Sequence, residues 1–526
     1  MNSQVLLPTD SITNNNLELF SSVYKKVMYT YPGPVDGNKL MLAGMNEMLK
    51  TIDPFTNFFS KDEVLDFKSS LSGKFGGTGM VLGTSPDGIF IRQTYAGRPA
   101  DRAGLRSADL ILEVDSISTK GMSIDEVRNL LRGEPGTYAT IEVMHAGAAK
   151  KTTVQFYREM ITVDAVTYSG MLNDDIAYIK LTRESEDCSS EVKKVLVELF
   201  DKHHFKSLVF DLRGNEGGYL REAVKISNLF IDKGNLIVSV RGKTGDSSYF
   251  APVIADYPAI SMVLLTDTNT ASAGEILSGA LQDNDRAVII GRKTYGKGLV
   301  QQVYDLPQGT QLKLTTGHYY TPSGRCIQAF EYDKGNRIHL ADSLKRNFKT
   351  KSGRLVYSSG GISPDIEIPL EQSPVIIEML LKDLMIFDFA TKYKIAHDTI
   401  APLSKFHLTE NDYKQFTEFV KSKKFNYTTE TENKLASVKE TAEKEGYWKE
   451  IQSYYTEIEN HLQQKKEKEL LQYKSEIKRE LEKEIISRYY FEKGRAEAGL
   501  SNDKEVIKAI EMLKDSVAYK KTLGIK

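Results

Sequence analysis

The sequence predicts a large α/β protein of several domains, and three observations lead to this prediction. At 526 residues the chain is too long for one hydrophobic core, and a prior of about 150 residues per domain gives three or four domains. In the middle of the chain, short apolar runs alternate with helical stretches, as in strands that lead into helices. In the last part, charged residues dominate and apolar residues recur every three to four positions, which predicts long helices.

The composition excludes several classes of function. A formal net charge of −1 gives no global attraction to nucleic acid or to an anionic membrane. No run of about eighteen apolar residues is present, so we expect no transmembrane helix. The two cysteines, Cys188 and Cys326, are too few and too far apart for a disulfide framework or a structural zinc site, and the histidines lack metal-ligand spacing. We expect no metal and no nucleotide cofactor.

A serine lies at a predicted turn between a strand and a helix. The apolar run 260–265 predicts a buried strand, turn residues follow it, and residues 274–281 have a helical pattern. Ser272 would then stand at the helix N-terminus with its hydroxyl exposed above the sheet. There the amide of Ala273 points outward, and the helix dipole favours a developing negative charge. This arrangement predicts a nucleophilic serine and half of an oxyanion hole.

A glycine-rich turn provides the expected second half of the oxyanion hole. Residues 206–211 predict a strand that leads to Gly217 and Gly218 and then to a helix. Because glycine has no side chain, its amide can approach a substrate carbonyl group closely. We assign Gly217 as the second donor. Most glycine pairs are only tight connections, so this assignment depends on the serine motif.

Lys297 is the expected base for Ser272. The serine and the lysine together predict a serine peptidase. It lies between Gly296 and Gly298, after the apolar run 287–291, and this pattern fits a half-buried position. A lysine can accept a proton only if burial lowers its pKa enough to leave a neutral fraction. The alternatives are a solvated turn lysine and a histidine base, for which His318 is the candidate.

Five separated motifs occur along the chain. They are Asp211-Leu212-Arg213 with Asn215 and Gly217-Gly218, the serine segment 268–276, Gly296-Lys297-Gly298-Leu299-Val300-Gln301, Tyr319-Tyr320-Thr321-Pro322-Ser323-Gly324-Arg325, and Gly361-Ile362-Ser363-Pro364-Asp365. In this order they resemble the carboxy-terminal processing peptidases, also called tail-specific proteases, and with the region before them they cover residues 38–370. The resemblance implies a serine endopeptidase with an α/β catalytic core of the crotonase and Clp-protease type.

The resemblance also implies the roles of individual residues. Ser272 is the nucleophile, Lys297 is the base, and Gln301 orients the lysine. Four residues along an ideal strand span about 13 Å, so a contact between Lys297 and Gln301 requires a bent chain or side chains that lean together. Glu275, one helical turn after Ser272, is the alternative partner for the lysine.

Residues 70–158 resemble a PDZ domain of the type inserted in these peptidases. A glycine-rich loop that enters an edge strand can offer successive amides to a C-terminal carboxylate, while the strand pairs with the peptide. Gly77, Thr78, Gly79 and Met80 are the expected tail-binding residues. Ala108 stands where the pattern usually has glycine, and we expect a small change in that turn. The alternative is a domain that only packs against the core.

The expected domains are an N-terminal helical region (1–69), the PDZ domain (70–158), the protease core (159–372) and a C-terminal helical region (373–526). The N-terminus lacks the regions of a secretory signal, which taken literally predicts the cytoplasm. The resemblance instead implies the periplasm or cell envelope and a trimmed chain with an added Met1.

The expected partners are protein substrates with apolar C-termini, an adaptor protein and, through the C-terminal helices, a second copy in a homodimer. No nucleic acid is expected. A different class of function is an interaction scaffold in which the PDZ domain acts and the protease core is silent.

Overall fold

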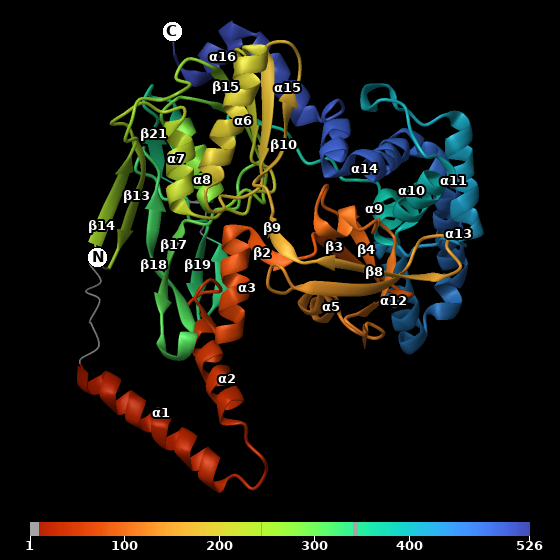
Figure 1. The fold of residues 1–526 in the computed structure, drawn as a ribbon, viewed down its shortest axis with the longest axis horizontal. Helices are drawn as coiled ribbons and strands as arrows, with labels where there is room; N and C mark the ends of the chain where they lie inside the picture. The colour runs from red at the N-terminus through yellow and green to blue at the C-terminus, as the bar shows by residue number, and fades with distance from the viewer. Residues whose placement is uncertain (1–9, 244, 340–345, 359, 526) are drawn as a thin grey trace.

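The computed structural model describes residues 10–525 except 244, 340–345 and 359. Figure 1 shows the α/β core, a smaller β domain beside it, a helical region that packs on that domain, and an N-terminal helix that extends away from the rest.

The core contains a six-stranded sheet in the order β10-β11-β12-β15-β16-β23. β10 is antiparallel to β11, and the other neighbours are parallel. The strands are β10 Val166–Met171, β11 Ile176–Leu181, β12 Ser207–Asp211, β15 Ser261–Thr266, β16 Val288–Gly291 and β23 Ile366–Glu367. The apolar runs expected at 260–265 and 287–291 form β15 and β16, because such runs fit strands that are buried on both faces.

Helices cover both faces of this sheet, as expected for an α/β core (Figure 1). One face packs against α6 Cys188–His203, α7 Leu220–Asn228 and α8 Ala273–Asp283. The other face packs against α15 Lys504–Lys514 and α16 Ser516–Leu523. The hydroxyl of Tyr519 accepts a hydrogen bond from the amide of Met262 in β15 at 2.7 Å. Helices α15 and α16 therefore belong to the core. The domain boundaries expected from the sequence instead assign them to a separate helical region, 373–526.

A second, antiparallel sheet has the order β1-β18-β13-β14, with β17 also paired to β18. Its strands are β1 Asn57–Phe59, β13 Leu236–Gly242, β14 Gly245–Phe250, β17 Leu299–Asp305 and β18 Gln311–Tyr320. The pairing of β17 with β18 is irregular between Val300 and Gln301. The remaining short elements of the core are η1 Pro307–Gly309, β19 Phe330–Asp333, β20 Asn336–His339, β21 Asn347–Lys349 and β22 Leu355–Tyr357. β1 is a correction to the N-terminal helical region expected at 1–69, because this segment is a strand that pairs with β18.

The β domain has a sheet in the order β3-β4-β5-β7-β8, with β6 beside β5. Its elements are β3 Met80–Ser85, β4 Gly88–Thr94, α4 Pro99–Arg102, β5 Leu110–Val114, β6 Ile117–Ser118, α5 Ile124–Leu131, β7 Tyr138–Met144 and β8 Lys151–Tyr157. A ribbon of β2 Lys74–Gly77 and β9 Glu159–Thr162 joins this domain to the core. Ala108 has φ 75°, so the turn keeps a left-handed conformation that favours glycine, with an alanine in its place.

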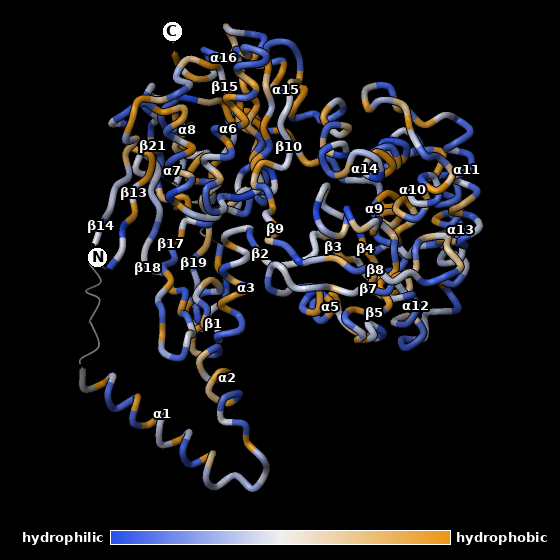
Figure 2. The backbone as a smooth tube through the Cα atoms, in the orientation of Figure 1, coloured by the Kyte–Doolittle hydropathy of each residue, from blue (hydrophilic) through white to orange (hydrophobic). Residues whose placement is uncertain are grey.

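Helices form both ends of the chain. They are α1 Asp10–Thr30, α2 Gly37–Lys50, α3 Lys61–Ser72, α9 Val375–Lys382, α10 Met385–Ala396, η3 Leu403–Lys405, α11 Glu410–Ser422, α12 Glu430–Glu445, α13 Trp448–Gln472 and α14 Lys474–Leu500. Apolar and polar residues alternate along α1, which packs against α2 and lies away from the remaining elements (Figures 1 and 2).

The apolar stripe of the C-terminal helices packs inside the chain. Ile477, Leu481 and Ile485 of α14 are fully buried in a cluster with residues of α9, α10 and α11. The expectation of a homodimer depends on this stripe, because an apolar stripe of this length is too long to leave in water. Intramolecular packing removes that reason, although Leu471 remains 72% exposed. A homodimer through these helices stays an untested prediction.

Candidate active site

Ser272 lies where the structure leaves β15 and enters α8, as the sequence predicts. It is the N-cap residue of α8, and its side chain is almost buried. Its backbone has φ 53° and ψ −114°, a conformation that is strained for any residue except glycine. The carboxylate of Glu275 accepts a hydrogen bond from the Ser272 amide at 2.9 Å and so holds this turn. Strain of this kind persists only where the surrounding structure fixes the backbone.

Gly217 lies directly against the serine. A Cβ atom at Gly217 would stand 2.7 Å from the Cβ of Ser272 and 2.9 Å from the carbonyl oxygen of Ala271, so only glycine fits here. The amide of Gly217 donates to Oδ1 of Asn215 at 2.8 Å. Among the described residues, the amides of Ala273 and Gly218 have no acceptor in the protein. Ala273 is thus free to act as an oxyanion donor, and Gly217 could do so only by sharing or releasing its bond to Asn215.

Lys297 is half-buried and lines a cavity that Ser272 also lines. Its Nζ atom lies 4.4 Å from the centre of the Phe55 ring, and it forms no ion pair with any described residue. Burial and the nearby charge of Lys313 lower the pKa of Lys297 to about 8, against the opposing effects of Glu275 and Asp53. A useful fraction of this lysine is therefore neutral near pH 8, as a base requires.

Glu275 connects the serine and lysine segments. Its buried carboxylate accepts hydrogen bonds from the hydroxyl of Thr294 at 2.5 Å and from the amides of Gly296 at 2.7 Å and Lys297 at 2.8 Å, besides that of Ser272. The sequence offers Glu275 as a partner of the lysine ammonium group. The structure instead places its contact at the lysine backbone, so Glu275 fixes the position of the segment.

Among the described residues the side chain of Gln301 forms no hydrogen bond with Lys297. Its amide Nε2 donates to the hydroxyl of Thr315 at 3.3 Å, across the irregular pairing of β17 and β18. The chain bends at this position, as a contact with the lysine would require, and Gln301 lines the same cavity. Its role in orienting Lys297 stays a prediction.

Buried Tyr319 lines the same cavity as Ser272. Burial raises the pKa of Tyr319, whereas the Ser272 side chain acts to lower it. Neighbouring residues in a strand point to opposite faces, and His318 accordingly lines a different cavity, with Asp53 and Cys326. The geometry therefore gives no support to His318 as the base.

One large cavity is lined by both Ser272 and Lys297. It has a volume of about 1130 Å³ and is lined by Ser272, Lys297, Gln301, Gly217, Tyr319 and Lys313 among others. A cavity of this size accommodates several residues of an extended peptide.

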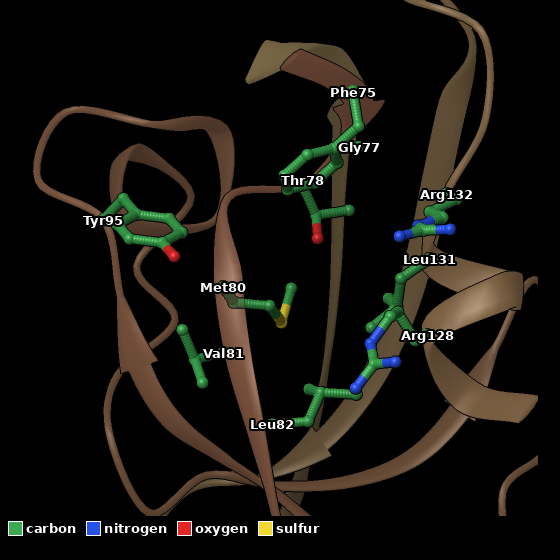
Figure 3. Close-up of a pocket in the computed structure, with 10 residues that line it drawn as sticks. All are labelled: Phe75, Gly77, Thr78, Met80, Val81, Leu82, Tyr95, Arg128, Leu131 and Arg132. Atoms are coloured by element: carbon green, nitrogen blue, oxygen red, sulfur yellow. The ribbon is translucent and has the colours of Figure 1, made fainter. Parts of the chain in front are cut away.

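A second, smaller cavity lies in the β domain between β3 and α5 (Figure 3). It has a volume of about 240 Å³. Three of the four predicted tail-binding residues line it, namely Gly77, Thr78 and Met80. Gly79 is not among the lining residues, but its φ of 77° gives the loop its turn. Because β3 is an edge strand, a peptide could pair with it beside this cavity.

Among the described residues no group of three or more His, Cys, Asp or Glu side chains is placed to hold a metal ion. None of the described helices is long and apolar enough to cross a membrane. Cys188 and Cys326 are both free thiols.

Three family profiles match consecutive parts of the chain. "Peptidase family S41" matches residues 175–334, "PDZ domain" matches residues 90–143, and "Probable PDZ-protease, C-terminal helical domain" matches residues 376–513. The carboxy-terminal-processing protease of Bartonella bacilliformis is 32% identical over 340 residues, which are 62% of this chain and 78% of that protein. The chain belongs to the carboxy-terminal processing protease family. It is a protease with a PDZ domain.

Two further proteins are similar to the chain. A "Probable CtpA-like serine protease" of Staphylococcus aureus is 33% identical over 316 residues, which are 60% of this chain and 63% of that protein. The solved structure of the photosystem II D1 C-terminal processing protease has 26% sequence identity and a TM-score of 0.38, and the match covers 69% of this chain and 95% of that one.

Several residues of the site have no role in the sequence-based prediction. Tyr319 lies in a motif, but nothing in the motif indicates that it shares a cavity with Ser272. Phe55 reaches Lys297 from the N-terminal segment, which a pattern along the chain cannot reveal. Glu184 lines the cavity next to Asn215, and burial raises its pKa to about 8. Lys313 could not be placed by strand periodicity, because the pairing with β17 is irregular.

Proposed function

We propose that this protease is a serine endopeptidase in which Ser272 is the nucleophile and Lys297 is the base. The strained turn at Ser272 supports the first role, because such backbone strain is typical of catalytic residues. The lowered pKa of Lys297 in the same cavity supports the second role. This juxtaposition of a strained serine and an unpaired lysine carries the proposal, and it argues against a silent scaffold.

The reaction then follows from the properties of these groups. Neutral Lys297 accepts the proton of the Ser272 hydroxyl as the oxygen attacks the scissile carbonyl carbon. The amide of Ala273 stabilises the developing oxyanion, with Gly217 as the second proposed donor. Protonated Lys297 gives its proton to the leaving amine, and water then hydrolyses the acyl-enzyme with the lysine again as base.

The described side chains must move before this reaction. Among the described residues Ser272 and Lys297 share no hydrogen bond, and the ammonium group of Lys297 lies over Phe55. Nζ must leave the ring and approach the hydroxyl when a substrate binds. Gln301 could hold Nζ in the new position if it exchanges its bond to Thr315.

We also propose that the PDZ domain binds the C-terminal tail of the substrate. The loop 77–80 would receive the carboxylate, and β3 would pair with the peptide. Apolar side chains of Met80, Val81, Leu82 and Leu131 line the cavity beside the loop, which fits an apolar terminal residue (Figure 3).

The cellular location and the further partners are proposed from the family resemblance. The family resemblance supports work in the periplasm or cell envelope on protein substrates. An adaptor protein and a homodimer remain proposals from the same resemblance, without an interface in the described chain that identifies either partner.

Replacing Ser272 by alanine tests the nucleophile. We expect the rate of cleavage of an unfolded protein with an apolar tail to fall by a factor of about 10,000 or more, because no other group attacks the carbonyl carbon. The matched control is Ser278→Ala, which removes a buried hydroxyl of the same helix that donates to the carbonyl of Gly274. The control should keep nearly the original rate. Products identified by mass at an unchanged rate in Ser272→Ala would exclude this nucleophile.

The pH dependence of the rate tests the base. Lys297 must be neutral to act, so kcat/KM should rise with pH and level off above about 8, the pKa of this lysine. Lys297→Arg should be inactive throughout, because a guanidinium group does not lose its proton. His318→Ala is the control and should keep the rising limb. Activity in Lys297→Arg together with an inactive His318→Ala would make histidine the base.

Amidation of the substrate tail tests the proposed role of the PDZ domain. An amidated C-terminus lacks the charge that the loop amides would bind, so it should be cleaved more slowly than the free acid. Met80→Glu should weaken cleavage of the free acid, whereas Met160→Glu, at an exposed position of β9, should not. Equal cleavage of both tails by the unmodified enzyme would contradict this role.

A further inference from the structure

The active-site cavity contains a second lysine that the proposed reaction does not use. Lys313 lies on β18, opposite Asn57 of β1 and opposite Val303 of β17. Its side chain is half-buried and lines the cavity together with Ser272 and Lys297.

The partners of Lys313 are aromatic rings. Its Nζ atom lies 5.6 Å from the centre of the Phe59 ring and 5.5 Å from that of Phe67, and these two rings are stacked at 4.4 Å. Among the described residues no carboxylate lies within ion-pair distance of it, and it donates no hydrogen bond. Aromatic faces stabilise a cation without neutralising its charge. Lys313 thus keeps a positive charge that acts inside the cavity.

The carboxylates nearest to the two lysines bind neutral donors. Asp53 accepts hydrogen bonds from the amides of Phe55 at 2.7 Å and Thr56 at 2.8 Å, and from the Thr56 hydroxyl. Glu275 accepts four bonds from backbone and hydroxyl groups. Among the described residues neither acid forms an ion pair with Lys297 or Lys313, although Asp53 acts through space on both lysines and Glu275 acts on Lys297.

We propose that Lys313 is a positioning residue for the peptidase reaction, which keeps Lys297 in the neutral, proton-accepting form by like-charge repulsion inside the shared cavity. The proposal rests on the proposed function, because it requires Lys297 to be the base. Lys313 acts through Lys297 and does not itself contact the reacting atoms.

The electrostatics agree with this division of roles. Burial and the charge of Lys313 lower the pKa of Lys297, whereas Glu275 and Asp53 raise it. Burial also lowers the pKa of Lys313, and the charge of Asp53 opposes this effect. The charge of Lys313 favours the neutral form of Lys297. The other charged side chains that line the cavity are Arg183, Glu184, Glu216, Arg221 and Asp246.

The test is the pH profile of kcat/KM for Lys313→Gln, Lys313→Arg and the unmodified enzyme. Without the charge of Lys313, the rising limb of the Lys313→Gln profile should move by about one unit to higher pH. Because the rate follows the neutral fraction of Lys297, activity at pH 7 should then fall about tenfold and recover when the pH exceeds the new pKa. Lys313→Arg keeps the charge and should keep the limb in place.

Lys68→Gln is the matched control for a lost lysine charge. Lys68 follows Phe67 in α3 but is exposed and does not line the cavity, so its loss should leave the profile unchanged. An unmoved limb in Lys313→Gln, or an equal loss of activity at every pH, would overturn the proposal and make Lys313 a structural or binding residue. If Lys297→Arg is active, the proposed base itself fails, which is a separate result.

Discussion

The active site depends on one buried carboxylate. Glu275 lies one turn into α8 and accepts hydrogen bonds from the turn that carries Ser272 and from the segment that carries Lys297. A buried acid that satisfies four donors fixes each of them, because a lost partner would leave a polar group unpaired away from water. The strained backbone of Ser272 is tolerated for the same reason. The nucleophile and the proposed base therefore occupy fixed places, and only their side chains need to move.

The C-terminal end of the chain supports the opposite side of the site. Arg213, which follows β12 and precedes the glycine turn, forms ion pairs with Asp503 at 2.8 Å and with Glu505 at the start of α15. Glu505 also binds Arg292 after β16 at 2.7 Å. Half-buried charges that are paired in this way hold the loop against the returning chain. The C-terminal region is thus part of the protease core as well as a support for the PDZ domain.

Much of this arrangement can be predicted from the sequence, and the reasons are local. The strand before Ser272, the helix after it and the glycine turn follow from apolar runs and turn residues that lie close together in the chain. Contacts that join distant segments could not be predicted. Phe55 meets Lys297 only because β1 pairs with β18, and α15 covers the sheet only because the helical region returns to it. The hydrogen bond of Gln301 to Thr315 depends in the same way on an irregular strand pair.

The central claim is that Ser272 forms a covalent acyl-enzyme with the substrate. It is tested most directly by mixing the unmodified enzyme with a slowly hydrolysed peptidyl ester that ends in an apolar residue, quenching in acid and mapping the added mass. The account predicts that the acyl group is attached to Ser272 while product is released in a burst. Full turnover with the acyl group on another residue, or without any covalent adduct, would contradict it.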